Sequence, residues 1–180
     1  MAKTDFLQPV TAEVYRDYLV EKIAFKPKEL KIQVADDCLP MLEKFDLEWV
    51  VMELVGNCSE KGPETVTVDM VLKSVPSGKV RMEVGDDVVY EPEQLEKILA
   101  NITTGRAVRM NKGVLRAKEN ADFTGIGISS CKKIVEFWGG NMWHESTATG
   151  GIRVIAEWDR EQFFKTRKAP SQFIEWLAER

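Results

Sequence analysis

The stretch that decides the fold is residues 123–140, which read FTGIGISSCKKIVEFWGG. Two glycines, Gly125 and Gly127, come directly before a run whose apolar residues recur at helical spacing. Glycine lets the backbone approach an anion closely, and the free N–H groups at a helix N-terminus favour negative charge. The stretch therefore predicts a phosphate-binding turn that opens a helix, and a tight turn capped by Thr124 fits the same pattern.

A second informative segment is the helix that we expect from Asp46, its predicted N-cap, to the Gly62-Pro63 stop. Glu53 and Asn57 are four residues apart and share one face of this helix, at the border of core and solvent. A carboxylate there can take a proton from water, and an amide oxygen can ligate a hard cation such as Mg²⁺. A solvent-facing glutamate and a helix-end asparagine remain the alternative. The buried stripe of the helix is predicted at Leu47, Val50, Val51, Leu54, Val55 and Cys58.

A third signal comes from the end of a predicted β-hairpin. Alternating apolar residues at 66–72 and 80–84 predict two strands joined by a turn at 76–78. Asp86 shares the parity of the buried residues, so it ends the second strand on the buried side. Its carboxylate can accept a hydrogen bond from an exocyclic amine such as that of adenine, and a plain polar strand end is the alternative.

The order of the predicted elements indicates the fold class. Helices and strands alternate in a way that predicts one α/β domain (an α+β two-layer sandwich), with a mixed sheet covered mainly on one face by helices. Residues 101–124 lack periodicity, and we interpret them as a long mobile loop of the kind that forms lids or binding loops. Five basic residues and no acid lie between Arg106 and Lys118, which fits either a solvated loop or a cover over an anionic ligand.

Composition narrows the class of protein. The 180 residues are 44% hydrophobic, enough for a full core, and a net charge of −4 gives no global attraction to nucleic acid or to an anionic membrane. The cysteines, Cys38, Cys58 and Cys131, have no C-x-x-C spacing, so we expect no zinc site and reduced thiols in a cytoplasm. The first ten residues lack a long apolar run, so we expect neither a secretion signal nor a membrane span.

Together these segments resemble a known superfamily. Residues 53–57 resemble the Asn box of the superfamily of gyrase B, heat-shock chaperones, histidine kinases and MutL, and residues 84–87 the start of its first glycine box. Residues 123–128 resemble its second glycine box, and the continuation to Gly140 is especially similar to histidine-kinase catalytic domains. The resemblance covers residues 30–158 and implies a histidine-kinase-type ATP-binding fold. From the residues on either side we expect a helical extension (1–29) and an apolar helical tail packed on the domain (159–180).

The resemblance also implies ligands and roles. ATP and Mg²⁺ would be the cofactors, with the metal at Asn57, the adenine amine at Asp86 and a general base at Glu53 in the hydrolysing branches. The segment before the second glycine box would be the ATP lid. Phosphates would lie against Thr124, Gly125, Ile126, Gly127 and Ile128.

The chain also departs from the family pattern. Val88 and Tyr90 stand at two positions where the first glycine box has glycine, and Phe123 replaces the first glycine of the second box. The one histidine, His144, falls on a predicted strand, so the expected N-terminal helix carries no phosphoacceptor histidine.

Two functions stay open. The chain would be a signalling kinase or ATPase component that acts in trans on a protein partner, or a degenerate relative that serves as a regulatory or scaffold module. Open space behind Asp86 would favour the first, and side chains filling that space would favour the second.

Overall fold

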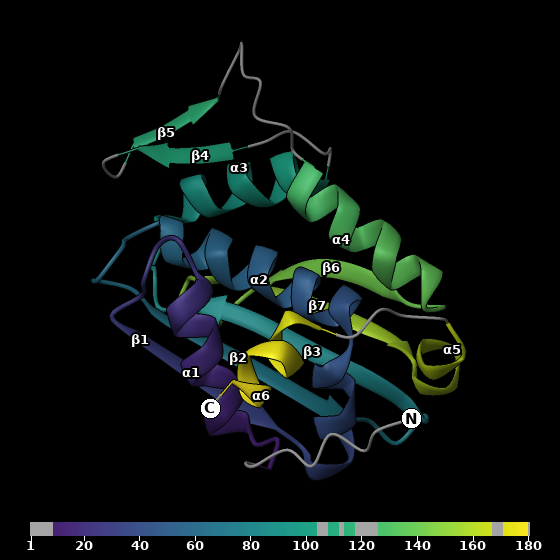
Figure 1. Ribbon diagram of the computed structural model, residues 1–180. Helices are drawn as coiled ribbons and strands as arrows, with labels where there is room; N and C mark the ends of the chain where they lie inside the picture. Colours follow the sequence, from purple (N-terminus) through teal and green to yellow (C-terminus); the bar gives the residue numbers. More distant parts are fainter. Residues whose placement is uncertain (1–8, 104–107, 112–113, 118–125, 167–170, 180) are drawn as a thin grey trace.

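The structure is a computed structural model that describes residues 9–103, 108–111, 114–117, 126–166 and 171–179. Side chains of residues 101–127 are not described. The elements, labelled in Figure 1, are α1 (Ala12–Lys22), β1 (Glu29–Val34), the 3₁₀ helix η1 (Asp36–Glu43), α2 (Phe45–Glu60), β2 (Thr67–Ser74), β3 (Lys79–Asp86), α3 (Pro92–Thr103), β4 (Val108–Asn111), β5 (Val114–Ala117), α4 (Ile126–Phe137), β6 (Asn141–Ser146), β7 (Ile152–Asp159), α5 (Arg160–Lys165) and α6 (Gln172–Ala178).

A mixed sheet organises the domain. Its strand order is β1-β2-β3-β7-β6, with β1 parallel to β2 and the other neighbours antiparallel. The chain passes from β1 through η1 and α2 before it enters β2, a crossover that a parallel pair requires. The predicted hairpin is confirmed as β2 and β3, and Asp86 lies opposite Val68 at its open end.

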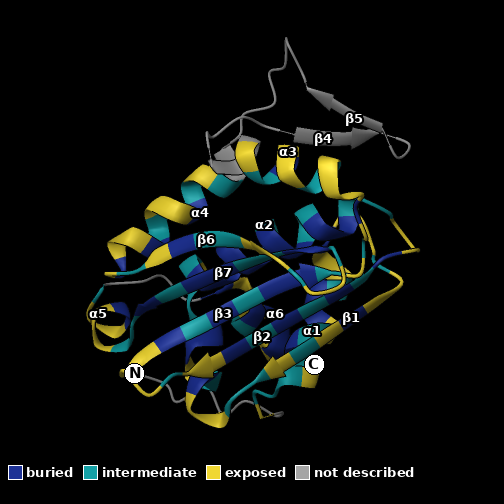
Figure 2. Cartoon of the chain, turned by 180° about the vertical axis from the view of Figure 1, so that it is seen from behind, coloured by how far each residue is buried: buried dark blue, intermediate teal, exposed yellow. Residues whose placement is uncertain are grey.

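Helices cover one face of this sheet. Seen from behind in Figure 2, the sheet lies in front of α1, α2 and α6, so the predicted two-layer arrangement is confirmed. All six residues of the predicted stripe on α2 are buried, and α2 packs against β2, β3 and α4. Fully burying a side chain such as Leu54 contributes about 1.5–3 kcal/mol, so this stripe fixes α2 on the sheet.

The first and last helices join the same core. Thr11 caps α1 as predicted, accepting a hydrogen bond from the Val14 N–H at 3.2 Å. The Tyr18 ring lies 5.3 Å from those of both Phe173 and Trp176 of α6. The Tyr18 hydroxyl donates a hydrogen bond to the buried carboxylate of Glu48 on α2. These contacts tie α1 and α6 to α2.

Two local predictions were wrong. Asp46 is not the N-cap of α2, because η1 runs up to Glu43 and Lys44 alone separates the two helices, so α2 begins at Phe45. Asp46 lies in the first turn instead, where its negative charge interacts favourably with the positive end of the helix dipole. The stretch 101–124 is not a continuous loop, since α3 extends to Thr103 and β4 pairs with β5. Four-residue strands are too short for their alternation to stand out in sequence.

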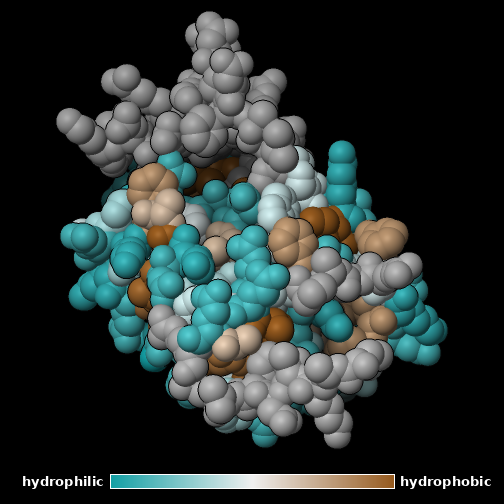
Figure 3. Space-filling model, viewed as in Figure 1, coloured by the Kyte–Doolittle hydropathy of each residue, from teal (hydrophilic) through white to brown (hydrophobic). Residues whose placement is uncertain are grey.

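The surface carries both hydrophilic and hydrophobic residues. The face in Figure 3 is mainly hydrophilic, with small separate hydrophobic areas. In the part of the chain that the structure describes, no helix has the length and apolar character needed to cross a membrane.

Candidate functional site

Helix α2 presents the first two candidate residues. Glu53 and Asn57 are half-buried and lie one turn apart, beside the stripe that faces the sheet. Helix α2 packs against α4. Burial, and after it the negative charge of Glu53 on α2, raise the pKa of the Cys131 thiol on α4 to about 12.

The glycine-rich turn leads into α4. The helix begins at Ile126, so Ile126 and Gly127 belong to its first turn, whose backbone N–H groups have no partner within the helix. Ile128 is half-buried and packs against the core. Thr124 and Gly125 lie outside the described residues, as do Phe123 and three members of the basic run, Arg106, Lys112 and Lys118.

Asp86 lies at the end of β3, as predicted, but its carboxylate already has partners. Its side chain is 0% exposed, and its Oδ2 lies 2.6 Å from Nζ of Lys61, which is 24% exposed. Its Oδ1 accepts a hydrogen bond from the Val88 N–H at 3.1 Å. Both oxygens of the expected base-binding residue are therefore engaged by this chain.

Lys61 comes from the end of α2. It is the C-cap residue of that helix, and its Nζ lies 5.7 Å from the centre of the Tyr90 ring. Burial acts to lower the pKa of Lys61, but Cys58, Asp86 and Tyr90 together raise it well above its usual value. The ammonium therefore stays charged, within an ion pair and against an aromatic face.

Tyr90 and Val88 fill the positions where the family has glycine. The Tyr90 ring is buried with Ile98 of α3 and Ile152 of β7. Its backbone N–H donates to the Gly150 carbonyl at 3.1 Å, which holds the segment after β3 against the β6–β7 turn. A Cβ on Gly151 would lie 3.0 Å from the Val88 carbonyl oxygen. Glycine at position 151 therefore allows the β6–β7 turn to approach the backbone of Val88 this closely.

His144 lies in the same neighbourhood on β6. Burial, aided by the positive charge of Lys61, lowers its pKa to about 4. Its Nε2 is buried and has no hydrogen-bond partner in the described part of the chain. His144 is therefore neutral at physiological pH.

Lys61 is a site residue that was not predicted from the sequence. A pattern that could have indicated it is its spacing, because Glu53, Asn57 and Lys61 recur every four residues along one helix face. The sequence does not show, however, that the side chain turns back from α2 to an aspartate on β3.

These residues fit a magnesium-bound nucleotide in part. Asn57, Glu53 and the first turn of α4 offer the oxygen ligand, carboxylate and N–H groups that a metal and phosphates require. The base end differs, because Lys61 engages the carboxylate that a base amine would need. Among the described residues, no group of three or more His, Cys, Asp or Glu side chains is arranged to hold a metal.

Comparison with known proteins decides the family. The family model described as histidine kinase-, DNA gyrase B-, and HSP90-like ATPase matches residues 43–162. The chain belongs to this family. The resemblance inferred from the sequence is thereby confirmed, and the chain is a histidine-kinase-like ATP-binding domain.

The chain is also similar to individual known proteins. The adaptive-response sensory kinase SasA of Gloeothece citriformis is 26% identical over 151 residues, which cover 81% of this chain and 35% of that protein. The chain thus spans about a third of the length of this curated relative. The nucleotide-free catalytic domain of histidine kinase ThkA superposes with a TM-score of 0.50 at 23% identity, over 83% of this chain and 91% of that one. The histidine kinase domain of the Erythrobacter litoralis EL346 blue-light activated kinase has a TM-score of 0.48 at 13% identity, over 93% and 70%.

Proposed function

We propose that this chain is an ATP- and Mg²⁺-binding component of a cytoplasmic signalling system, which acts in trans on a protein partner as a kinase or ATPase. The observation that carries the proposal is the position of Glu53 and Asn57 on the face of α2 beside α4. An amide and a carboxylate there lie on a helix that packs against α4, whose first turn contains Ile126 and Gly127.

Each residue has a defined role in this proposal. The amide oxygen of Asn57 would hold the magnesium ion, and the N–H groups at the start of α4 would hold phosphate oxygens. Magnesium-ATP, when bound, supplies the phosphoryl group and its charge neutralisation. The Glu53 carboxylate would orient the attacking water or hydroxyl and accept its proton. Such catalysis depends mainly on positioning and electrostatics, which a fixed helix pair provides.

The surroundings of His144 argue against this residue as the phosphoacceptor. His144 is neutral, and its Nε2 is buried, so it is poorly placed to accept a phosphoryl group. The sequence holds no second histidine. A histidine acceptor, if the system uses one, would therefore lie outside these 180 residues.

A second candidate function is a regulatory or scaffold module that has lost the nucleotide. Two features favour it: the ion pair between Lys61 and Asp86, and the buried Tyr90 ring that faces the Lys61 ammonium. Side chains of this chain cover Asp86, whose own side chain has no exposed surface. The two candidates differ in one measurable property, which is the binding of magnesium-ATP.

Calorimetric titration with magnesium-ATP tests the proposal. Wild-type protein is expected to bind, and Asn57→Ala to bind at least about tenfold more weakly, a loss of about 1.4 kcal/mol. Asn141→Ala, at an exposed position on β6, is the matched control and should bind as wild type does. Melting curves add a check, since ligand at about 100 times Kd should stabilise by about 2.7 kcal/mol. No heat and no melting shift at millimolar nucleotide would refute the proposal in favour of the second candidate.

A further inference from the structure

We infer that Lys61 closes the base end of the nucleotide site, holding its ammonium on Asp86 where a base amine would bind, and that nucleotide must displace it. The inference rests on the proposed nucleotide binding and adds a residue that regulates it. The evidence is the geometry of the ion pair, the anchoring of the helix end that carries Lys61, and the partial exposure of the lysine side chain.

The ion pair occupies the place beside the carboxylate where a base amine would bind. The Lys61 ammonium and the Val88 N–H each bind one oxygen of Asp86, whose side chain has no exposed surface. To bind here, the exocyclic amine of a base must donate an N–H to a carboxylate oxygen, and it needs space beside that oxygen. With Lys61 in place, the approach to this carboxylate is blocked.

The backbone at Lys61 is fixed, which directs the side chain toward β3. The Lys61 N–H bonds to the Cys58 carbonyl at 3.3 Å, and the Gly62 N–H bonds to the Ser59 carbonyl at 3.3 Å. The Thr65 and Val66 N–H groups both bond to the Gly62 carbonyl at 3.0 Å, which closes the turn after the helix. A Cβ on Gly62 would lie 2.5 Å from the Thr65 hydroxyl, so the turn is tightly packed.

The lysine side chain still has a route away from Asp86. It is 24% exposed, whereas Asp86 is fully covered, so the ammonium can reach solvent by rotation of its methylene chain without movement of α2. Lys61 therefore behaves as a movable closure over a fixed carboxylate.

Displacement has a cost that lowers the apparent affinity. The Lys61 ammonium neutralises the negative charge of the buried Asp86 carboxylate, whereas a base amine carries no charge. Replacing Lys61 by nucleotide therefore leaves this buried charge without a cation beside it, which costs free energy. The apparent Kd rises as the fraction of molecules with an open site falls. If about a tenth of the molecules are open, removal of the ammonium should tighten binding about tenfold.

Titration of lysine variants with magnesium-ATP tests this. Lys61→Met should bind at least about tenfold more tightly than wild type. Lys61→Arg, which keeps a cation, should stay near wild type. Lys73→Met removes the exposed lysine that pairs with Glu83 on the same sheet, and is the matched control that should leave the affinity unchanged. If Lys61→Met binds as wild type does or more weakly, the inference fails while the proposed function stands. If neither protein binds, both fail.

A second measurement uses the wild-type protein alone, so it does not depend on a variant that leaves Asp86 unpaired. The protein is treated briefly with an amine-acetylating reagent, with and without magnesium-ATP, and each lysine is quantified by mass spectrometry. Nucleotide should speed the labelling of Lys61 several-fold, because displacement exposes its amine, and leave Lys73 unchanged. Unchanged or slower labelling of Lys61 at a saturating nucleotide concentration would overturn the inference.

Discussion

The ring of His144 on β6 lies within electrostatic reach of the Lys61 ammonium at the end of α2. Burial is the larger cause of the low pKa of His144, about 4, and the lysine charge adds to it. The site thus combines a half-buried neutral histidine with a partly buried ion pair, and both have consequences that can be measured.

The depressed pKa of His144 predicts a loss of stability in mild acid. The unfolded chain takes up a proton near the ordinary value of 6.5, whereas the folded chain resists protonation down to about 4. Between these values the unfolded state binds more protons, so the free energy of unfolding should fall by on the order of 2 kcal/mol as the pH drops from 7 to 4.5. Urea unfolding at several pH values measures this fall.

His144→Gln is the matched variant for the pH experiment. With the only histidine removed, the fall between pH 7 and 5 should largely disappear, since carboxylates titrate mostly below this range. An identical fall in wild type and variant would show that His144 is not the group responsible.

Two glycines should respond oppositely to alanine. A Cβ on Gly140 would lie 2.3 Å from the Glu157 carbonyl oxygen and 2.7 Å from the Trp158 Cα, both backbone atoms that cannot move aside easily. Gly140→Ala should therefore destabilise by about 1–3 kcal/mol or more. Gly56→Ala meets no described atom within 4 Å and lies inside α2, so it should stabilise by about 0.5–1 kcal/mol. Thermal or urea unfolding of both variants checks this, and destabilisation by Gly56→Ala would contradict it.

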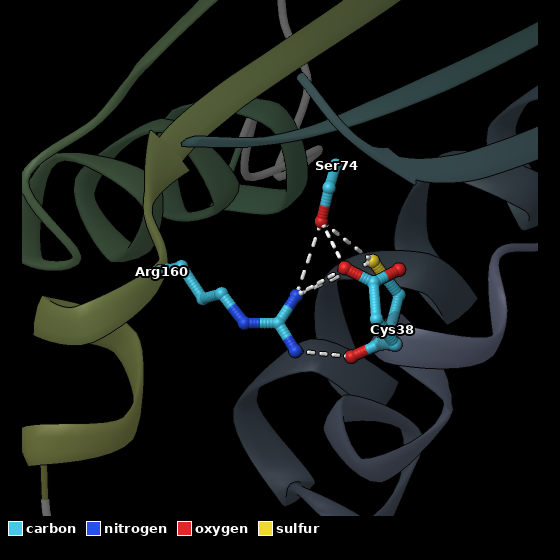
Figure 4. A network of polar contacts seen from close by, with 4 residues as sticks. Cys38, Ser74 and Arg160 are labelled. Carbon is cyan, nitrogen blue, oxygen red and sulfur yellow. Dashed lines mark hydrogen bonds and ion pairs between the residues drawn. The ribbon is translucent and has the colours of Figure 1, made fainter. Parts of the chain in front are cut away.

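Arg160 should matter for stability through the network in Figure 4. Its guanidinium joins the start of α5 to η1 and β2, with Nη1 at 2.9 Å from Asp37 Oδ2 and 3.1 Å from Ser74 Oγ. Nη2 also donates to the Asp37 carbonyl. Arg160→Met should lower the free energy of unfolding by about 1 kcal/mol, because the contacts are several but partly exposed to solvent. Lys165→Met, which removes an exposed pair with Glu161 on the same helix, should have a clearly smaller effect. Equal effects of the two variants would rule out a structural role specific to Arg160.

Glu53→Gln separates binding from turnover. If Glu53 accepts a proton during phosphoryl transfer or hydrolysis, the variant should bind magnesium-ATP normally but turn it over about a hundredfold more slowly. Glu29→Gln, at an exposed position on β1, is the control. Release of phosphate or ADP measures turnover, and an unchanged rate in Glu53→Gln would remove Glu53 from the catalytic role.

Periodicity was sufficient for the long elements of the fold and insufficient for short or non-local features. The stripe on α2 and the β2–β3 hairpin follow from patterns that extend over many residues, and the structure confirms both. The start of α2 was misplaced because a preceding 3₁₀ helix shifts the boundary, which a capping rule does not foresee. The β4–β5 hairpin was missed because its strands are only four residues long.

In the candidate site, too, the sequence predicted where residues lie along the chain but not which distant residues they contact. The sequence and the family resemblance predicted Asp86 at the end of its strand, and the structure has it there. Its ion pair with Lys61 could not be predicted, because it depends on the path of a flexible side chain between residues 25 apart in sequence. Helix spacing places Lys61 on the face of Asn57, but only the packing of α2 on β3 brings the ammonium to the carboxylate.

Mapping the binding of a non-hydrolysable magnesium-ATP analogue by ¹H–¹⁵N NMR tests the proposed nucleotide site most directly. The largest shifts are expected at the Asn57 side-chain amide and the backbone amides of Val88 and Gly127, with Asn141 unaffected. Shifts confined to other parts of the chain, or none at millimolar analogue, would contradict a nucleotide site between α2, the end of β3 and the start of α4.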